Sequence, residues 1–193
     1  NEGKPAISAQ VVASELRVVN TLKGQGYPEA KALPRKVIVD HETDAMTVNY
    51  DIATGWKTRF GEIKRTGSAY LLESWPEMIS PFEPGEVYQQ SKINTLSSRA
   101  IGAGVFDSAA ATLEEGGTEN ADGTITRNVL LNIEQGDKNT ISGEIGYSTA
   151  DGSGVSASYE RRNFIGYAQT LKLTATAKTN LQSFGVNYNI PYA

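Results

Sequence analysis

Residues 136–166 read GDKNTISGEIGYSTADGSGVSASYERRNFIG, and the chain changes character within this stretch. The residues before it mix helical and strand-like patterns. From Ile141 onward, apolar residues recur at every second position, which is the period of a strand with one apolar face. Because Ala150–Gly154 is a tight, glycine-rich turn, the stretch predicts a β-hairpin that opens a second, purely strand-based architecture.

The alternation continues to the end of the chain in short segments that are joined by brief turns. Its apolar positions are Ile141, Ile145 and Tyr147; Val155, Ala157 and Tyr159; Leu171, Leu173, Ala175 and Ala177; and Phe184, Val186, Tyr188 and Ile190. A strand of about ten residues is ~33 Å long, and at a tilt of ~40–45° it crosses an apolar band of ~25 Å. The segments therefore fit the first strands of a transmembrane β-barrel. The pattern alone fits a soluble sandwich with one buried face equally well.

The first 136 residues combine helices and strands. The spacing of apolar residues and the Gly and Pro stops predict helices at Ile7–Lys23, Tyr70–Ile79 and Glu86–Ala103, and strands at Ala32–Asp40, Met46–Ile52, Phe60–Thr66, Gly104–Leu113 and Thr124–Gln135. The segment His41–Asp44 is predicted to be a polar hairpin tip, and Glu114–Gly123 a glycine-rich loop.

Part of this pattern occurs twice. Residues 26–32 (GYPEAKA) match residues 104–110 (GVFDSAA), and residues 48–55 (VNYDIATG) match residues 129–136 (VLLNIEQG), at offsets of 78 and 81 residues. The repeated unit is strand–helix–helix–strand–strand, and its first copy lacks the opening strand and the first helix. The alternative is a chance similarity of two turn-plus-strand pairs.

Several motifs resemble the bacterial surface antigen family, whose members are outer-membrane barrels that assemble or translocate other proteins. Residues 143–149 (GEIGYST), 152–154 (GSG) and 159–166 (YERRNFIG) look like the first hairpin of that barrel. The repeated unit is similar to the polypeptide-transport-associated (POTRA) domain at residues 60–63 (FGEI), 84–86 (PGE) and 104–106 (GVF), and at Gly67. The family's signature near its last barrel strands has no counterpart here.

The resemblance implies a fold class and a division of the chain. We expect α+β POTRA domains (strand–helix–helix–strand–strand) followed by the first antiparallel strands of a transmembrane β-barrel, so that the chain is a fragment. The expected parts are a partial POTRA-like domain at residues 1–56, a complete one at 57–136, and the first four barrel strands at 137–193.

The resemblance also implies two binding edges. The second strand of a POTRA sheet can pair with an extended client segment; it corresponds here to residues 32–39 in the first copy and, in the second, to Val105, Phe106, Asp107, Ser108, Ala109, Ala110 and Ala111. An edge that is merely tolerated, or that a neighbour covers, is the alternative. The first barrel strand, which closes the seam, contains Ile141, Gly143, Ile145, Gly146 and Tyr147. Its glycines are expected to weaken pairing.

The composition argues against most other chemistry. The chain has 18 Lys+Arg, 22 Asp+Glu and a net charge of −4, without a basic stripe, so we expect no nucleic-acid partner. It has no cysteine, and no apolar run of about 18 residues that would form a transmembrane helix. Its one histidine, His41, lies with Asp40, Glu42 and Asp44 in a hairpin tip where side chains diverge. We therefore predict no enzyme, no catalytic triad, no metal and no cofactor.

The predicted function is the assembly, insertion or translocation of outer-membrane or secreted proteins, with the POTRA domains in the periplasm of a bacterium. The expected partners are protein clients, a periplasmic or inner-membrane assembly partner and the lipid bilayer. The isolated chain is expected to self-associate through its strand edges. The alternatives are a two-partner secretion-type transport barrel, a barrel that anchors an enzyme domain, and a soluble β-rich binding module.

Overall fold

The computed structural model describes residues 7–150 and 152–192, and of Ser148 only the backbone. The predicted turn residue Asp151 thus lies outside the described residues. The chain divides into two compact units. Unit 1 comprises Asn1–Glu62, Phe82–Asn94 and Leu113–Val129, and unit 2 comprises Ile63–Pro81, Thr95–Thr112 and Leu130–Ala193.

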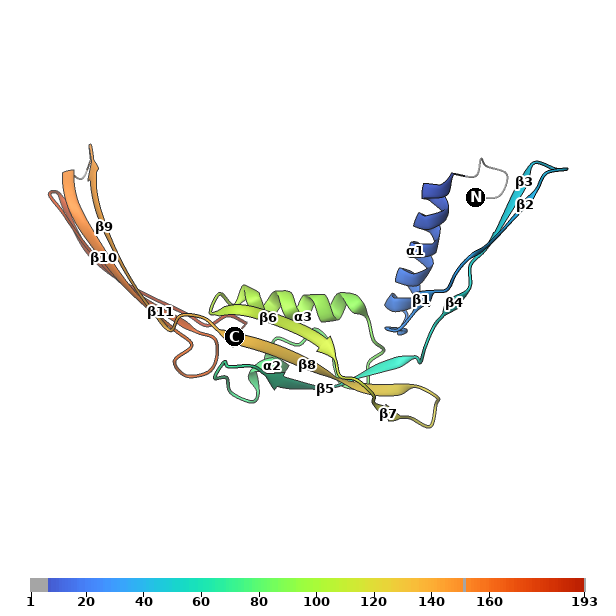
Figure 1. Cartoon of the computed structure of the whole chain (residues 1–193). Coiled ribbons are helices and arrows are strands. Elements are labelled where there is room, and N and C mark those ends of the chain that lie inside the picture. The colour runs from blue at the N-terminus through green and yellow to red at the C-terminus, as the bar shows by residue number, and fades with distance from the viewer. Residues whose placement is uncertain (1–6, 151, 193) are drawn as a thin grey trace. The chain divides into compact units, whose positions relative to one another are not determined.

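Unit 1 begins with a helix that is followed by two short strand pairs. The elements are α1 (Ser8–Gly24), β1 (Lys31–Ala32), β2 (Lys36–Asp40), β3 (Ala45–Asn49) and β4 (Ile52–Ala53). Strand β1 pairs with β4, and β2 pairs with β3 (Figure 1). The helix matches the predicted one within a residue, and its Val11 carbonyl accepts a hydrogen bond from the Tyr50 hydroxyl (3.0 Å).

The two strands predicted for this region, Ala32–Asp40 and Met46–Ile52, are each interrupted, and in this detail the prediction was wrong. Pro34 has no backbone N–H to donate, so the strand breaks between β1 and β2. Pairing continues on both sides of the break, because the Leu33 N–H donates to the Asp51 carbonyl (2.8 Å). The predicted tip at residues 41–44 is a turn, and the Asp40 carboxylate accepts the Glu42 N–H (2.9 Å).

The remaining sheet consists of β5 (Thr58–Thr66), β8 (Ile125–Gln135) and β6 (Phe106–Leu113), in that order, with the short β7 (Thr118–Glu119) paired to β8. In unit 1 its core is aromatic. The Phe60 ring stacks on Phe82 with centroids 4.0 Å apart, and Tyr88 lies 5.4 Å from Phe60. All three are nearly inaccessible to solvent, so burial of apolar area stabilises this end of the sheet.

The first strand pairs and this sheet are joined within unit 1. The Gly26 carbonyl accepts the Thr58 N–H (2.7 Å), and Arg127 of β8 forms an ion pair with Glu29 (2.8 Å). Gly26 has φ +104°, and a Cβ on it would lie 2.7 Å from a Val87 methyl group. A glycine is therefore required there both by conformation and by space.

The two helices predicted between residues 70 and 103 are both shorter than expected. The segment Tyr70–Ile79 forms only the turn α2 (Trp75–Met78), and Glu86–Ala103 is reduced to α3 (Gln90–Gly102). The backbone before α3 is used elsewhere, because the Glu86 carbonyl and the Tyr88 N–H bond to β5. Tertiary pairing has overridden local helix propensity there. In unit 2, Trp75 packs edge-on against Phe106, with ring centroids 5.4 Å apart.

Unit 2 also holds a second sheet of order β12-β11-β10-β9, with each neighbour antiparallel (Figure 1). Its strands are β9 (Asn139–Ser148), β10 (Gly152–Arg162), β11 (Thr170–Lys178) and β12 (Leu181–Asn189). They agree with the four predicted segments to within a few residues at each end. Among the described residues, no helix has the length and apolar character needed to span a membrane.

The loop between β7 and β8 generates a pH prediction. The Thr124 hydroxyl donates to Asp122 (2.6 Å) and lowers its pKa from 3.8 to about 2, with further contributions from the Thr124 N–H and Arg59. Since the folded-state pKa is depressed, ionised Asp122 favours folding above pH ~4, and this contribution is lost as the pH falls toward 2. Replacing Thr124 by valine is expected to move the pKa of Asp122 back toward 3.8 in a carboxyl NMR titration.

Asp40 serves as the control for that titration. Its pKa is lowered chiefly by a hydrogen bond from Thr43, in a different hairpin of unit 1, and should not respond to Thr124→Val. An unchanged Asp122 midpoint in the Thr124→Val protein would contradict this account.

Candidate functional site

The register of β9–β12 aligns all the apolar positions on one face of the sheet. Tyr159 of β10 lies between Ile141 of β9 and Leu173 of β11, and Leu173 pairs in turn with Val186 of β12. Because cross-strand partners project to the same side of a sheet, the odd-numbered residues of β9, β10 and β11 and the even-numbered residues of β12 lie on this apolar face.

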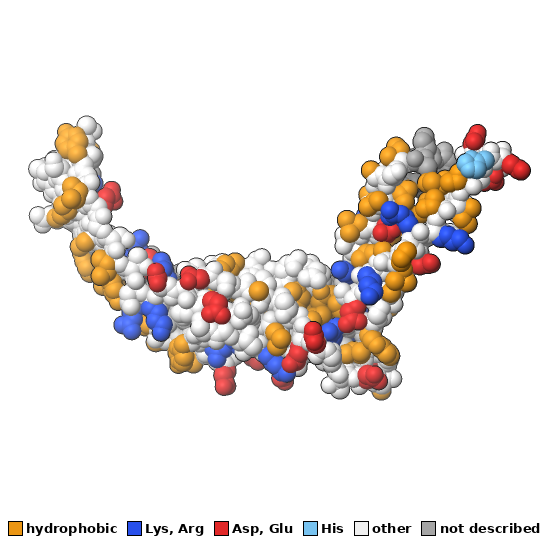
Figure 2. Space-filling model, in the orientation of Figure 1, with side chains coloured by type: hydrophobic (Ala, Val, Ile, Leu, Met, Phe, Trp, Pro, Cys, Tyr) orange, Lys and Arg blue, Asp and Glu red, His pale blue; other side chains and the backbone are white. Residues whose placement is uncertain are grey.

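Nothing in the described part of the chain covers the apolar face. Ile145 is 87% exposed, Ile141 81% and Phe184 71%. Figure 2 shows hydrophobic side chains along the visible surface of this sheet. Monomeric soluble proteins rarely expose a contiguous apolar patch of this kind, which marks a surface for lipid or for a protein partner. A soluble sandwich would need this face buried, and within the described residues it is not.

The opposite face is polar. Glu160 lies opposite Lys172, and Glu144 lies opposite Ser156. An open cavity of about 420 Å³ is lined in part by Glu144, Ser156 and Lys172. The two faces thus differ as the lipid side and the wet side of a barrel wall differ.

Strand β9, which holds the predicted seam residues, is an edge strand of its sheet. A Cβ built on Gly143 would meet no atom within 4 Å, and one on Gly146 only the Glu144 carboxylate at 3.9 Å. Neither glycine is needed to avoid a clash. On β10, by contrast, a Cβ on Gly154 would lie 2.5 Å from the Ala177 carbonyl and would also collide with Lys178.

Strand β6, which holds the predicted client-binding residues from Phe106 on, lies at the end of its sheet order. It runs antiparallel to β8, since the Glu114 N–H bonds Asn128 while the Val105 carbonyl accepts the Gly136 N–H. The Ala111 N–H does not point to β8. It donates to the Ser97 hydroxyl of α3 (2.8 Å), the helix that lies beside β6 in Figure 1. One backbone donor of this edge is therefore already occupied.

The start of β6 carries a second edge feature. Phe106 is buried, Asp107 and Ser108 are both exposed, and burial resumes at Ala109 and Ala111. This one-residue shift of phase is that of a β-bulge, a feature common at sheet edges. By strand alternation, the Ala109 N–H points to the same side as that of Ala111, away from β8. The corresponding strand of the first copy, residues 32–39, is split between β1 and β2.

The sequence did not reveal a buried polar residue that links three segments of unit 2. Asn163, in the turn between β10 and β11, is 4% exposed and has φ +49°. Its amide nitrogen donates to the Tyr70 carbonyl (2.7 Å) and to Gln135 Oε1 (2.8 Å), and its amide oxygen accepts the Ala168 N–H (3.1 Å). Asparagine tolerates the left-handed conformation better than most residues, which suits it to this position.

The rest of the 163–169 turn is also fixed to unit 2. The Leu72 N–H donates to the Gly166 carbonyl (3.0 Å), and a Cβ on Gly166 would lie 2.9 Å from that nitrogen. Gln169 is fully buried, and its side-chain oxygen accepts the Tyr167 N–H (3.0 Å). The turn therefore anchors the β9–β12 sheet to the segment before α2 and to the end of β8.

The hairpin tip at His41 is the place where the sequence groups possible metal ligands. No cluster of three or more metal-ligating side chains occurs among the residues that the structure describes. The Asp40 carboxylate is engaged by the backbone of its own turn.

The anchor yields a stability prediction. Asn163→Ala removes three hydrogen bonds at a buried position and places alanine at a positive φ, at an expected cost of about 2–4 kcal/mol. Amide hydrogen exchange at Ala168 and Leu72 should then accelerate by about 30-fold or more.

Two further variants separate the loss of hydrogen bonds from the conformational strain and from a general effect of removing an asparagine. Asn163→Gly loses the same hydrogen bonds without the conformational strain, so its effect should be smaller than that of alanine. Asn187→Ala, at an exposed position of β12, should leave both amides protected. Equal exchange rates in Asn163→Ala and the unmodified chain would show that Asn163 is not an anchor.

No family model matches the sequence. Solved structures do match the fold. BamA from Haemophilus ducreyi lacking POTRA domains 1–3 superposes with a TM-score of 0.79 at 16% identity, over 97% of this chain and 34% of that one. CdiB from Acinetobacter baumannii matches with a TM-score of 0.53 at 13% identity, over 98% of this chain and 35% of that one.

The POTRA3–5 segment of Haemophilus influenzae BamA matches with a TM-score of 0.50 at 12% identity, over 66% of this chain and 48% of that one. The chain spans about a third of the length of the first two proteins. At these identities the likeness concerns the fold. The chain is α+β and strand-rich, and it shares the fold of these BamA structures, which is the fold that the sequence resemblance led us to expect.

Proposed function

We propose that this chain is part of an outer-membrane factor that inserts or translocates other proteins. The observation that carries the proposal is the uncovered apolar face of β9–β12, which runs in register across four strands whose other face is polar. In this proposal the sheet is the beginning of a barrel wall in a bacterial outer membrane, and the residues before it lie in the periplasm.

The comparisons support a division into a POTRA-like part and a barrel part. The match to the POTRA3–5 structure extends over 66% of this chain, whereas the match to BamA lacking POTRA domains 1–3 extends over 97%. This difference favours POTRA-like domains at 1–56 and 57–136 and another architecture at 137–193. Within the family, the layout resembles most the barrel subunit of the translocation and assembly module.

The proposed work of β6 is to bind client segments by adding a strand to its edge. The Ala109 N–H points outward and is available to a client, whereas the Ala111 N–H must first leave the Ser97 hydroxyl. Backbone pairing reads little of the client's sequence, which suits a factor with many clients. Strand β9 is the second proposed edge, where an incoming strand would pair beside the barrel wall. Neither role needs a catalytic group or a cofactor.

A two-partner transport barrel is the second candidate, and the match to CdiB favours it. The two candidates differ in the range of clients. A soluble β-rich binding module is the third candidate, and the exposed apolar face argues against it unless a partner covers that face.

The β6 edge can be tested by photo-cross-linking from Asp107, an exposed residue near the start of this strand. The probe is a synthetic peptide with the sequence of β11, residues 170–178, as a barrel-strand mimic. Ala109→Pro removes one outward N–H and should reduce cross-linking strongly, whereas Ala109→Ser keeps the N–H and should not. Ser97→Ala frees the Ala111 N–H and should raise the apparent affinity about five-fold, the equivalent of one net hydrogen bond.

An unchanged yield in Ala109→Pro would contradict strand addition at β6. The same assay distinguishes the two transport candidates. A second peptide with unrelated residues but the same alternation should bind equally well if the factor serves many clients, and should fail to bind if the edge serves one dedicated partner.

The β9 edge generates a separate prediction. Gly143→Val adds strand propensity without a clash and should strengthen β9–β10 pairing by up to about 1 kcal/mol. Amide exchange in β9 should slow about five-fold. Gly154→Val is the contrasting variant, because its side chain would collide with Ala177 and Lys178, and it should loosen β10 from β11. Faster exchange in Gly143→Val would refute the idea that this glycine keeps the edge weak.

A further inference from the structure

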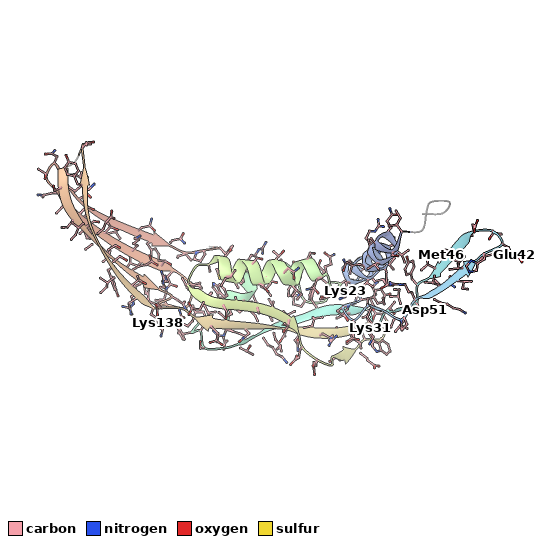
Figure 3. The ribbon with its side chains drawn as sticks, turned by 45° about the horizontal axis from the view of Figure 1, so that its top comes forward. Lys23, Lys31, Glu42, Met46, Asp51 and Lys138 are labelled. Carbon is pink, nitrogen blue, oxygen red and sulfur yellow. The ribbon has the colours of Figure 1, made fainter. Side chains whose placement is uncertain are left out.

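A small cavity lies where the β9–β12 sheet meets its anchoring turn. Its volume is about 160 Å³, and its lining includes Tyr70, Lys138, Asn139, Arg161, Arg162 and Phe164. All of these residues belong to unit 2. Figure 3 labels Lys138, just before the start of β9. Three of the lining side chains are cationic, so the cavity is suited to an anion.

Two of the three cations have no carboxylate partner. Arg162 donates to Glu160 (2.6 Å) and to the Asp137 carbonyl, so its charge is compensated. Neither Lys138 nor Arg161 takes part in an ion pair within the described ranges 7–150 and 152–192. The cavity is therefore lined by two cations, Lys138 and Arg161, that no carboxylate of the described ranges compensates in an ion pair.

Arg161 has an unusual place in the pattern of the sheet. It is an odd-numbered residue, opposite Leu171 of β11, and so it continues the apolar face beyond Tyr159. A cation costs roughly 2–4 kcal/mol on the lipid side of a barrel at mid-depth but only about 0–1 kcal/mol near the interface. Its position at the end of β10 thus marks the boundary of the apolar face.

Two aromatic rings lie near this boundary of the apolar face. The Arg161 guanidinium lies over the Phe164 ring, 5.6 Å from its centroid, and the Phe164 and Tyr188 ring centroids are 6.3 Å apart. A ring contact engages the face of a guanidinium and leaves its N–H edge available for a phosphate oxygen. Aromatic residues next to cations are the arrangement found at membrane–water interfaces.

We infer that this cavity binds the phosphate group of a phospholipid, with Arg161 and Lys138 as its charged donors. A lipid, rather than free phosphate, is the occupant because Arg161 stands at the end of the exposed apolar face, where acyl chains would lie. The inference rests on the proposed membrane position of β9–β12.

The test uses the whole chain in maltoside micelles, which contain no phosphate. Dihexanoyl phosphatidylglycerol is titrated in, and the NMR signals of the Arg161 Nε–H and the Phe164 amide are followed. Both should shift in a saturable manner, while the amides of Lys31 and Lys36, on β1 and β2, should not.

The double variant Lys138→Gln/Arg161→Gln should weaken binding, read at the Phe164 amide, by about ten-fold, as expected for the loss of charge-assisted hydrogen bonds. Lys31→Gln/Lys36→Gln removes the same charge elsewhere and should bind as the unmodified chain does. If the double variant does not fold, Lys138→Gln alone replaces it in the test, because it changes one exposed side chain. This single variant should weaken lipid binding about three-fold. Unchanged affinity in the variant that folds overturns the inference.

Inorganic phosphate forms the second arm of the titration. It should bind at least about ten-fold more weakly than the lipid, and equal affinity would overturn the lipid assignment in favour of a site for free phosphate. A paramagnetic lipid in the micelle tests the proposed membrane position of β9–β12 separately. It should broaden the NMR signals of Ile145 and Phe184 whether or not the cavity is filled. Absent broadening would refute the membrane position, while the Phe164 titration would still identify the ligand of the cavity.

Discussion

The register of β9–β12 is the constraint on which the rest of unit 2 depends. Side chains of a strand alternate with a period of two, so a slip of one residue in any pair would bring Lys172 or Glu160 to the apolar face. The observed pairing keeps the odd positions of β9, β10 and β11 together with the even positions of β12. A face that is apolar in one register only, and that remains exposed, indicates selection for contact with something outside this chain.

The 163–169 turn fixes the β9–β12 sheet to β8, because Asn163 bonds to Gln135 at the end of that strand. A turn between two strands needs no buried asparagine to reverse the chain, and the short polar turn at Thr179–Asn180 reverses it without one. Asn163 instead bonds to Tyr70 and Gln135, residues 93 and 28 positions away in the sequence. A buried amide that satisfies three partners in different segments defines one relative arrangement, because any shift would leave polar atoms unpaired.

The sequence predicted the elements whose information is local and missed those whose information is not. Alternation located β9–β12 because a period of two is visible in the residues themselves. Pro34 could have indicated the break between β1 and β2, since it cannot donate a backbone hydrogen bond. The shortening of α3 and the reduction of its predecessor to α2 follow from pairing of Glu86 and Leu72 with distant segments. Asn163 belongs to the motif at residues 159–166, but its anchoring role is not visible in the sequence because Tyr70 and Gln135 are remote from it.

The two edges differ in how they are protected, and this difference bears on how each can be used. At β6, a bulge interrupts the strand and the Ser97 hydroxyl holds the Ala111 N–H, which are devices that discourage uncontrolled pairing. In the proposed role, a client would exchange one hydrogen bond for another at that point, so the net gain would be small and binding there readily reversed. Strand β9 has neither device in the described residues, and Gly143 and Gly146 lower its intrinsic preference for a paired strand. If β6 and β9 act as proposed, reversible pairing at β6 and a longer, unprotected edge at β9 suit the transfer of an extended segment rather than its retention.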